Sequence, residues 1–217
     1  MIGHLTIEEI GNKEFEGVSE FKYLGNIIEN NNRNDRCIKE RIQTGSKAYY
    51  GNLQVLKSKI ISRRSKLQIY KTLIRPVVTY GAETWMLTAA EENVLRRFER
   101  KVLRKIYGPV VDKGVWRIRY NTELCKLMVG EDIVRFINAQ RIQWLGHVER
   151  MDETAIPKRV LKGKLYATRR IGRPRIRWLE DVIADPRRMG ISGWVEKARS
   201  RDQWRQIVKE AKANPGL

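Results

Sequence analysis

Apolar residues recur at helical spacing through most of this chain, and that periodicity constrains its fold more than any other feature. One such segment opens with Thr88-Ala-Ala-Glu91, the pattern of a helix capping box, and stops at Gly108-Pro109. A second box pattern, Ser200-Arg-Asp-Gln203, opens the last helix, and Pro76 is expected to kink or end an earlier one. Spacing of this kind predicts helices that each bury one face against another helix. We therefore expect a mainly α protein, with helices over 34–56, 63–81, 88–108, 131–151, 174–185 and 200–212.

Residues 5–29 follow a different pattern, with β-branched and aromatic residues around a Gly11-Asn12 turn signal. We expect a small N-terminal β-hairpin there, which must lean on the helices because two strands alone are marginally stable. Helical periodicity fades after Met151. The expected division is a terminal hairpin over 1–30, a helical domain over 31–151 and a smaller, basic C-terminal helical region over 152–217.

The formal net charge of +19 points to a polyanionic partner, most often nucleic acid. The charge is unevenly spread: residues 1–35 carry seven acids and three bases, whereas residues 36–75 carry eleven bases and one acid, Glu40. Residues 158–177 carry nine bases and no acid. Such blocks make a strong local field. The alternative interpretation is a basic surface that serves solubility alone.

Residue patterns that carry catalysis are missing from the sequence. The two cysteines, Cys37 and Cys125, have no paired spacing, so we expect neither disulfides nor a zinc site, and a reducing intracellular compartment fits them best. The carboxylate pairs Glu131-Asp132 and Glu180-Asp181 are expected on solvated helix faces. No stretch has the apolar length of a membrane span. We therefore expect no metal, cofactor, small-molecule substrate, membrane contact or catalysis by this chain alone.

Five segments of the chain occur in the order found in a known family. They are FEGVSEFKYLGNII (15–28), IYKTLIRPVVTYGAETW (69–85), QWLGHVERM (143–151), GRPRIRWLEDV (172–182) and ARSRDQWRQIV (198–208). The first resembles the Phe-x-Tyr-Leu-Gly segment that ends the palm of reverse transcriptases from non-LTR (LINE-like) retrotransposons. The second is similar to the thumb helix that follows in those proteins, and the last three to their C-terminal region. The resemblance covers nearly the whole chain.

This resemblance implies a terminal palm hairpin, a thumb-like domain that grips a template–primer duplex, and a C-terminal region. Phe21, Lys22, Tyr23, Leu24 and Gly25 would lie where the palm holds the primer end. The family's catalytic Phe- or Tyr-x-Asp-Asp turn and its endonuclease have no counterpart here. The resemblance thus implies a non-catalytic fragment of an RNA-directed DNA polymerase. Its partners would be RNA, DNA or a hybrid, and the missing palm and fingers, with exposed apolar surface where that palm packs. The nucleus is favoured over the cytoplasm by resemblance alone.

A thumb-type grip needs only contacts from Lys and Arg to phosphates. We assign such contacts to Arg63, Arg64, Lys66 and Lys71 beside the thumb-like helix, and to Lys22 on the hairpin. Three further arginines at helical spacing are either phosphate contacts or the solvated face of a helix. They are Arg96, Arg100 and Arg104.

The tripeptide Gly172-Arg173-Pro174 has three interpretations. Gly172 can break a loop so that Pro174 starts a helix, the surrounding arginines can bind phosphates, or the segment can read a minor groove as an AT-hook does. The first two are compatible. The arginines assigned to phosphate binding are Arg169, Arg170, Arg173, Arg175 and Arg177.

Aromatic side chains can stack on bases, but their spacing here favours burial. We expect Phe21 and Tyr23 in the core more than on a base platform, together with Tyr80, Trp85, Trp144 and Trp178. The competing function is a decayed or reused helical module that binds a protein partner or serves a structural role. Continuous basic patches would favour nucleic-acid binding, whereas scattered charges would favour that module.

Overall fold

The structure is a computed structural model that describes residues 7–10, 13–31, 33–163 and 177–214. Most of these residues are helical, which confirms the expected mainly α class. The first set of helices is α1 (Asp35–Gly51), α2 (Leu53–Lys57), α3 (Arg63–Ile69), the π-helix η1 (Tyr70–Ile74), α4 (Arg75–Val78), the 3-10 helix η2 (Ala82–Thr84), α5 (Ala89–Tyr107), α6 (Asn121–Leu127) and α7 (Ile133–Glu149). The second set is α8 (Ile156–Lys162), α9 (Trp178–Arg188), α10 (Trp194–Arg199) and α11 (Arg201–Ala213).

In the part of the chain that the structure describes, the strands form three antiparallel hairpins, where the sequence predicted one. The N-terminal region holds two of them: β1 (Ile7–Ile10) with β2 (Lys13–Glu16), and β3 (Glu20–Tyr23) with β4 (Asn26–Glu29). The predicted Gly11-Asn12 turn lies outside the described residues. The third hairpin, β5 (Val110–Asp112) with β6 (Val115–Arg117), was not predicted from the sequence.

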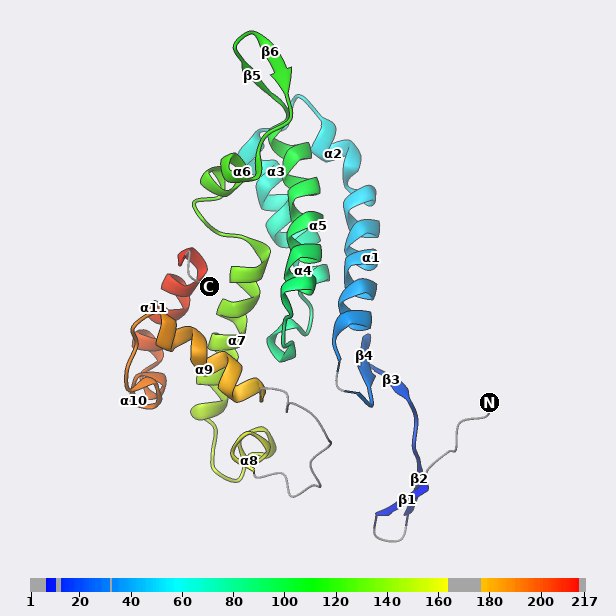
Figure 1. Ribbon diagram of the computed structural model, residues 1–217, viewed down its shortest axis with the longest axis vertical. Helices are drawn as coiled ribbons and strands as arrows, with labels where there is room; N and C mark the ends of the chain where they lie inside the picture. The colour runs from blue at the N-terminus through cyan, green and yellow to red at the C-terminus, as the bar shows by residue number, and fades with distance from the viewer. Residues whose placement is uncertain (1–6, 11–12, 32, 164–176, 215–217) are drawn as a thin grey trace.

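Figure 1 shows α1, α5 and α7 running along the long axis of the molecule. The hairpins β1–β2 and β3–β4 lie at the lower end, and the β5–β6 hairpin projects at the upper end beyond α5. The helices α9, α10 and α11 lie beside α7, and α11 makes the most extensive contact with it. The helical bundle thus carries two hairpins at its lower end and a single hairpin at its upper end.

The predicted helix starts are confirmed where a side chain caps them. Thr88 Oγ1 accepts from Glu91 N, and Glu91 Oε2 accepts from Thr88 N at 2.6 Å, which completes the capping box of α5. Ser62 and Ser200 cap α3 and α11 by accepting from Ser65 N and Gln203 N, but among the described contacts Gln203 does not return the second bond of the predicted capping box. The segment before Pro76 departs from an α-helix, because the π-helix η1 directly precedes α4 and the helix ends at Val78.

The helix predicted to start at Pro174 is described only from Trp178, and Pro174 itself lies outside the described residues. Arg177 occupies the position before its first turn, and Glu180 accepts from the Arg177 backbone N–H at 3.4 Å. The helix runs to Arg188, past the predicted end at Asp185, with Pro186 inside it.

Buried apolar side chains form two clusters that share α7. The N-terminal core runs from Cys37 to Ile137 and includes α1, η1, α4, α5 and the first half of α7. The C-terminal core runs from Ala139 to Ala211 and includes the second half of α7 with α9 and α11. The expected three-part division of the chain stays a prediction, and the two cores change over inside a helix. No helix in the described ranges is long and apolar enough to cross a membrane.

Candidate nucleic-acid interface

Two acid-free segments meet at the upper end of the bundle. Residues 41–82 and 100–111 contain no Asp or Glu. Folding brings them together, because α2 and α3 both contact α5. We call the five exposed cations gathered there the basic end. They are Lys57, Lys59, Arg63, Arg64 and Lys105.

None of the five cations of the basic end has an ion pair or a side-chain hydrogen bond within the described part of the chain. Arg63 and Arg64 stand in the first turn of α3, behind the Ser62 cap, and that turn holds no acid. Cations at a helix N-terminus oppose the helix dipole, which costs about 0.3–1 kcal/mol each at exposed positions. These two charges therefore do not serve the stability of α3.

The hydroxyl of Tyr107 lies close to cations of two different segments at the basic end. Burial raises the pKa of its hydroxyl, and the charges of Arg119 and Arg63 oppose that rise. One arginine comes from the segment after β6 and the other from α3. Nearby, the Lys101 ammonium donates to Tyr50 Oη at 3.0 Å and lies over the Tyr49 and Tyr50 rings, with no carboxylate partner in the described residues.

The residues assigned to phosphate contacts from the sequence are not equally accessible. Arg63 and Arg64 are exposed, but Lys66, one turn later on α3, is buried at 8% relative exposure. Lys71 lies on η1 and donates to Glu131 Oε2 at 2.8 Å. Lys22 on β3 is exposed and pairs with Glu40 at 2.8 Å.

The basic C-terminal segment lies almost entirely outside the described residues. Arg177 is exposed at the start of α9. The other four assigned arginines are not described, so the three interpretations of Gly172-Arg173-Pro174 stay predictions. The four are Arg169, Arg170, Arg173 and Arg175.

The three arginines left open on α5 have different surroundings. Arg96 is held by Glu92 at 2.8 Å and Asp132 at 3.1 Å, so its charge is neutralised. Arg104 donates to Asn121 Oδ1 at 2.7 Å and to the Arg119 carbonyl at 3.3 Å. Arg100 has no such partner among the described residues. The arginines of this α5 face therefore differ in charge compensation: Arg96 is neutralised through Asp132 at the start of α7, whereas Arg100 is not.

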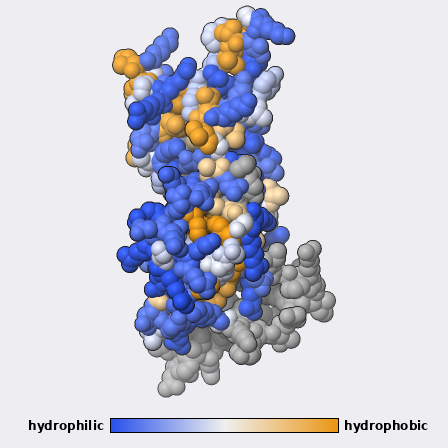
Figure 2. Space-filling view, turned by 90° about the vertical axis from the view of Figure 1, so that its left-hand side faces the viewer, coloured by the Kyte–Doolittle hydropathy of each residue, from blue (hydrophilic) through white to orange (hydrophobic). Residues whose placement is uncertain are grey.

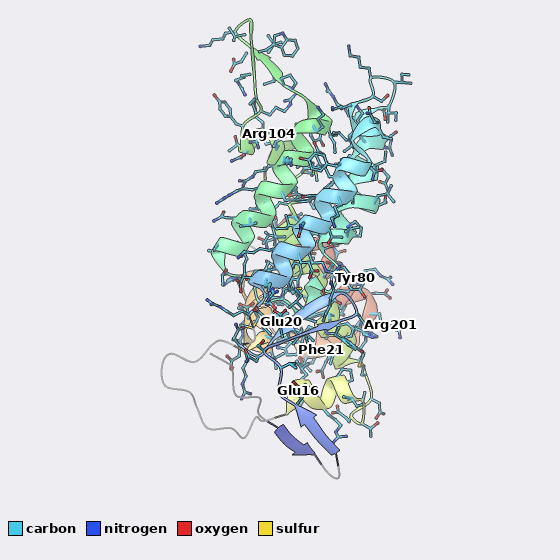
Figure 3. The ribbon with its side chains drawn as sticks, turned by 90° about the vertical axis from the view of Figure 1, so that its right-hand side faces the viewer. Glu16, Glu20, Phe21, Tyr80, Arg104 and Arg201 are labelled. Atoms are coloured by element: carbon cyan, nitrogen blue, oxygen red, sulfur yellow. The ribbon has the colours of Figure 1, made fainter. Side chains whose placement is uncertain are left out.

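The primer-grip-like residues lie on the β3–β4 hairpin, and their side chains are open. Phe21 and Tyr23 are each 56% exposed, which corrects the expectation that they lie in the core, and Leu24 is also exposed. The hairpin turn needs positive φ at Leu24 (46°) and Gly25 (79°). In Figure 3, Phe21 lies at the β3–β4 hairpin and Tyr80 lies above it, near the middle of the molecule.

Arg41 of α1 holds this hairpin on the bundle. Its Nε donates to Asn26 Oδ1 at 3.0 Å and its Nη2 to the Gly25 carbonyl at 2.6 Å. The guanidinium lies 4.6 Å from the centre of the Tyr80 ring. Tyr80 is itself about half exposed, another correction, while Trp85 is buried as predicted. Trp144 and Trp178 are only partly buried.

Glu180 is exposed as expected, but Glu131, Asp132 and Asp181 are only partly exposed and pair with cations. Glu131 accepts from Lys71 and from Arg75, whose side chain is buried, and Asp132 caps α7 and pairs with Arg96. Asp181 pairs with buried Arg141. These acids compensate cations that the fold buries. In the described residues no group of three His, Cys, Asp or Glu could hold a metal ion.

A second basic surface was missed by the sequence analysis. Basic residues recur along one face of α11, and with Arg150, the residue that follows α7, they line a cavity of about 400 Å³. Burial and the charge of Arg201 both lower the pKa of Arg150. The spacing alone could have revealed this stripe, since the positions are four, four and three residues apart. They are Arg201, Arg205, Lys209 and Lys212.

Comparison with known proteins gives one relationship. No protein-family profile and no solved structure matches the chain. The uncharacterized transposon-derived protein F52C9.6 of Caenorhabditis elegans is 21% identical over 207 residues, which are 93% of this chain and 74% of that protein. The chain is thus similar, over nearly all its length, to a transposon-derived protein.

Proposed function

We propose that this chain is a transposon-derived, non-catalytic protein that binds nucleic acid by gripping the phosphate backbone with its basic end. The observation that carries this proposal is the meeting of two acid-free segments, 41–82 and 100–111, where five exposed cations have no ion-pair or hydrogen-bond partner among the described residues. Lys and Arg bind phosphates without reading bases, so no further recognition element is needed for a backbone grip.

The local energetics support this proposal. Arg63 and Arg64 lie where the dipole of α3 disfavours cations, and no acid in that turn offsets them. Some cations of the bundle centre are neutralised instead, as Glu131 does for Lys71 and Arg75. A cluster that is left unneutralised at one end is suited to a polyanion that arrives from outside.

The finer part of the proposal is a thumb-like role in a reverse transcriptase of the non-LTR type. It rests on the order of the resembling segments and on the similarity to a transposon-derived protein. The exposed apolar residues of the β3–β4 hairpin, Phe21, Tyr23, Leu24 and Ile28, are suited to packing against a palm and fingers. A nuclear location belongs to the same proposal.

The test is binding to a labelled RNA–DNA hybrid duplex across a salt series. The variant removes three cations of the basic end: Lys59→Ala, Arg63→Ala and Arg64→Ala. Each lost phosphate contact should flatten the slope of log K against log salt by about 0.7–0.9, so the triple variant should flatten it by about 2–3. The affinity loss should be largest at low salt.

A charge-matched control removes three cations from α9 and α10, far from the basic end: Arg187→Ala, Lys197→Ala and Arg199→Ala. It should change the slope much less than the first variant. Equal slopes for the two variants would show that net charge alone drives binding. No measurable binding by the unaltered chain at about 50 mM salt would contradict the proposal and favour a partner-binding module.

A further inference from the structure

The β5–β6 hairpin has two chemically different faces. Its register sets Val111 opposite Trp116, Val110 opposite Arg117, and Asp112 opposite Val115. Residues opposite each other share a face, and successive residues alternate between faces. Val111 and Trp116 therefore form one face, which is wholly apolar, and Arg117 and Asp112 lie on the other together with Val110 and Val115.

The charged face is anchored to the bundle. Arg117 Nε donates to Asp112 Oδ2 at 2.8 Å, and its two terminal nitrogens donate to Glu123 of α6 at 2.8 and 3.0 Å. The guanidinium also lies 4.2 Å from the centre of the Tyr120 ring. These hydrogen bonds lower the pKa of Glu123 to about 2, so the anchor stays charged at any physiological pH. The hairpin is thus held with its other face turned away from α6.

The opposite face is apolar and open. Trp116 is 69% exposed and Val111 is 50% exposed, and Ile118, two residues after Trp116, is also exposed. A tight two-residue turn at Lys113-Gly114, with φ of 48° and 83°, fixes the strands that carry them. Apolar side chains presented on an anchored projection mark a surface that binds something.

The surroundings of this face favour nucleic acid as the occupant. The base of the hairpin adjoins the basic end, because Arg119 donates to the Gly108 carbonyl at 3.1 Å and its charge acts on Tyr107 together with Arg63. The two nearby acids, Asp112 and Glu123, are both occupied by Arg117. The charges left open are cationic, which complements phosphate and disfavours an apolar or basic protein surface.

The views of the molecule agree with this placement. Figure 3 shows the β5–β6 hairpin and the turn between α2 and α3 standing at the same end of the bundle, with Arg104 just below the hairpin. Figure 2 shows two projections at that end, each with apolar patches among hydrophilic atoms. A strand held by phosphate contacts on the basic end would therefore pass beside the hairpin.

We infer that the Trp116 face of the β5–β6 hairpin stacks on unpaired bases next to the backbone that the basic end holds. The ligand class is then a duplex with a single-stranded extension, and this inference rests on the proposed function. An indole ring offers a sequence-tolerant platform, since every base has a π-face.

The experiment compares two ligands that share one RNA–DNA duplex, one blunt and one with a single-stranded extension of eight nucleotides. We expect the unaltered chain to bind the extended ligand more tightly. Trp116→Ala should lower affinity for the extended ligand by about 5- to 100-fold, the range for losing a stacked base, and leave blunt-duplex affinity within about twofold. Trp116→Tyr should restore most of the preference, whereas Trp116→Leu, which keeps apolar area without a large π-face, should not.

A control variant, Val160→Ala on α8, removes a comparably exposed apolar side chain and should change neither affinity. Because Trp116 is largely exposed, the melting temperature of each variant should stay close to that of the unaltered chain. Equal affinities of the unaltered chain for blunt and extended ligands would overturn the inference and leave the proposed function intact. Absence of binding to both would overturn both. Self-association that Trp116→Ala abolishes, without any change in the preference for the extension, would identify the face as a protein contact and overturn the inference.

Discussion

The N-terminal and C-terminal cores share one helix and a common plan, but they differ in how they satisfy a buried charge. Each core contains a helical glycine at a close crossing and one buried carboxyl. In the N-terminal core, Glu99 accepts from Tyr70 Oη at 2.7 Å and from Ile133 N at 2.8 Å. In the C-terminal core, Asp185 has one partner, Arg188 at 3.1 Å, and its Oδ2 has none within the described residues.

The glycines show the same plan with different neighbours. A Cβ on Gly45 of α1 would lie 2.2 Å from Val78 Cγ2, and a Cβ on Gly146 of α7 would lie 2.0 Å from Trp204 Nε1. Val78 is a small side chain, whereas Trp204 is a buried ring that donates to the Ile142 carbonyl at 2.9 Å. At these positions the C-terminal core has the bulkier neighbour at its glycine and fewer hydrogen-bond partners for its buried carboxyl. This difference can be tested by matched substitutions in each of the two cores.

The largest effect is expected from Glu99 and pH. Burial raises the pKa of Glu99 from 4.5 to about 7, so the folded chain binds this proton more tightly than the unfolded chain. The free energy of unfolding should therefore fall by about 3 kcal/mol as pH rises from 4.5 through 7. Urea unfolding at pH 5 and pH 8 measures the fall.

Glu99→Gln should remove most of that dependence and be the more stable form at pH 8, because the amide is neutral and still accepts from Ile133 N. The control Glu91→Gln changes a carboxylate on the first turn of the same helix and should keep the fall between pH 5 and pH 8. A flat profile for the unaltered chain would mean that Glu99 is not held in a low-dielectric site.

The second effect is steric. Gly146→Ala should lower the free energy of unfolding by about 2 kcal/mol, since the new methyl group displaces Trp204 and weakens its hydrogen bond, beyond the helix propensity gained. Gly45→Ala, with only Val78 to displace, should cost less. Thermal unfolding of both variants measures the order, and a larger loss for Gly45→Ala would reverse our comparison of the cores.

The smallest effect concerns Asp185. Burial raises its pKa from 3.8 to about 6, while the charges of Arg141 and Arg188 oppose the rise. The same sign applies, so stability should fall as pH rises from 3.8 through 6. We expect a fall of about 1–2 kcal/mol, because Asp185 is less deeply enclosed than Glu99 and solvent screens part of the effect. Asp185→Asn should flatten that part of the urea-unfolding profile and leave the Glu99 part unchanged. Loss of both parts would show that the cores do not titrate independently.

The sequence predicted structure best where residues close together in the chain determine it, as at the ends of helices. Both ends of α5 follow from the Thr88 capping box and from Gly108, and the exposed arginines of α3 follow from the Ser62 cap. The β5–β6 hairpin was missed because its turn uses Lys113 at φ 48°, a conformation that turn patterns do not associate with lysine.

Contacts between distant segments could not be predicted in this way. Lys71 donates to Glu131, which is 60 residues away in the sequence. Helical spacing carries no information about that partner, so Lys71 was predicted to contact phosphate. Lys66 was assigned to the surface by its charge, yet only 8% of it is exposed in the folded chain. Phe21 and Tyr23 were expected in the core because aromatic residues usually pack, but the described residues leave them open. A signal for Glu99 did exist, since it falls beside Phe98 on the apolar stripe of α5.

The sharing of α7 has a consequence for dividing this protein into pieces. The change from one core to the other falls between Ile137 and Ala139, in the middle of a helix. A chain cut in the loop after α7 would keep the whole helix but strip the cover from Ile142, Leu145 and Val148, which are fully buried in the intact fold. Such a piece would carry a bare apolar stripe and would be prone to aggregate. Truncation directly after α7 is therefore a poor way to isolate the basic end. A soluble fragment that carries the basic end must keep α9 and α11 together with α7.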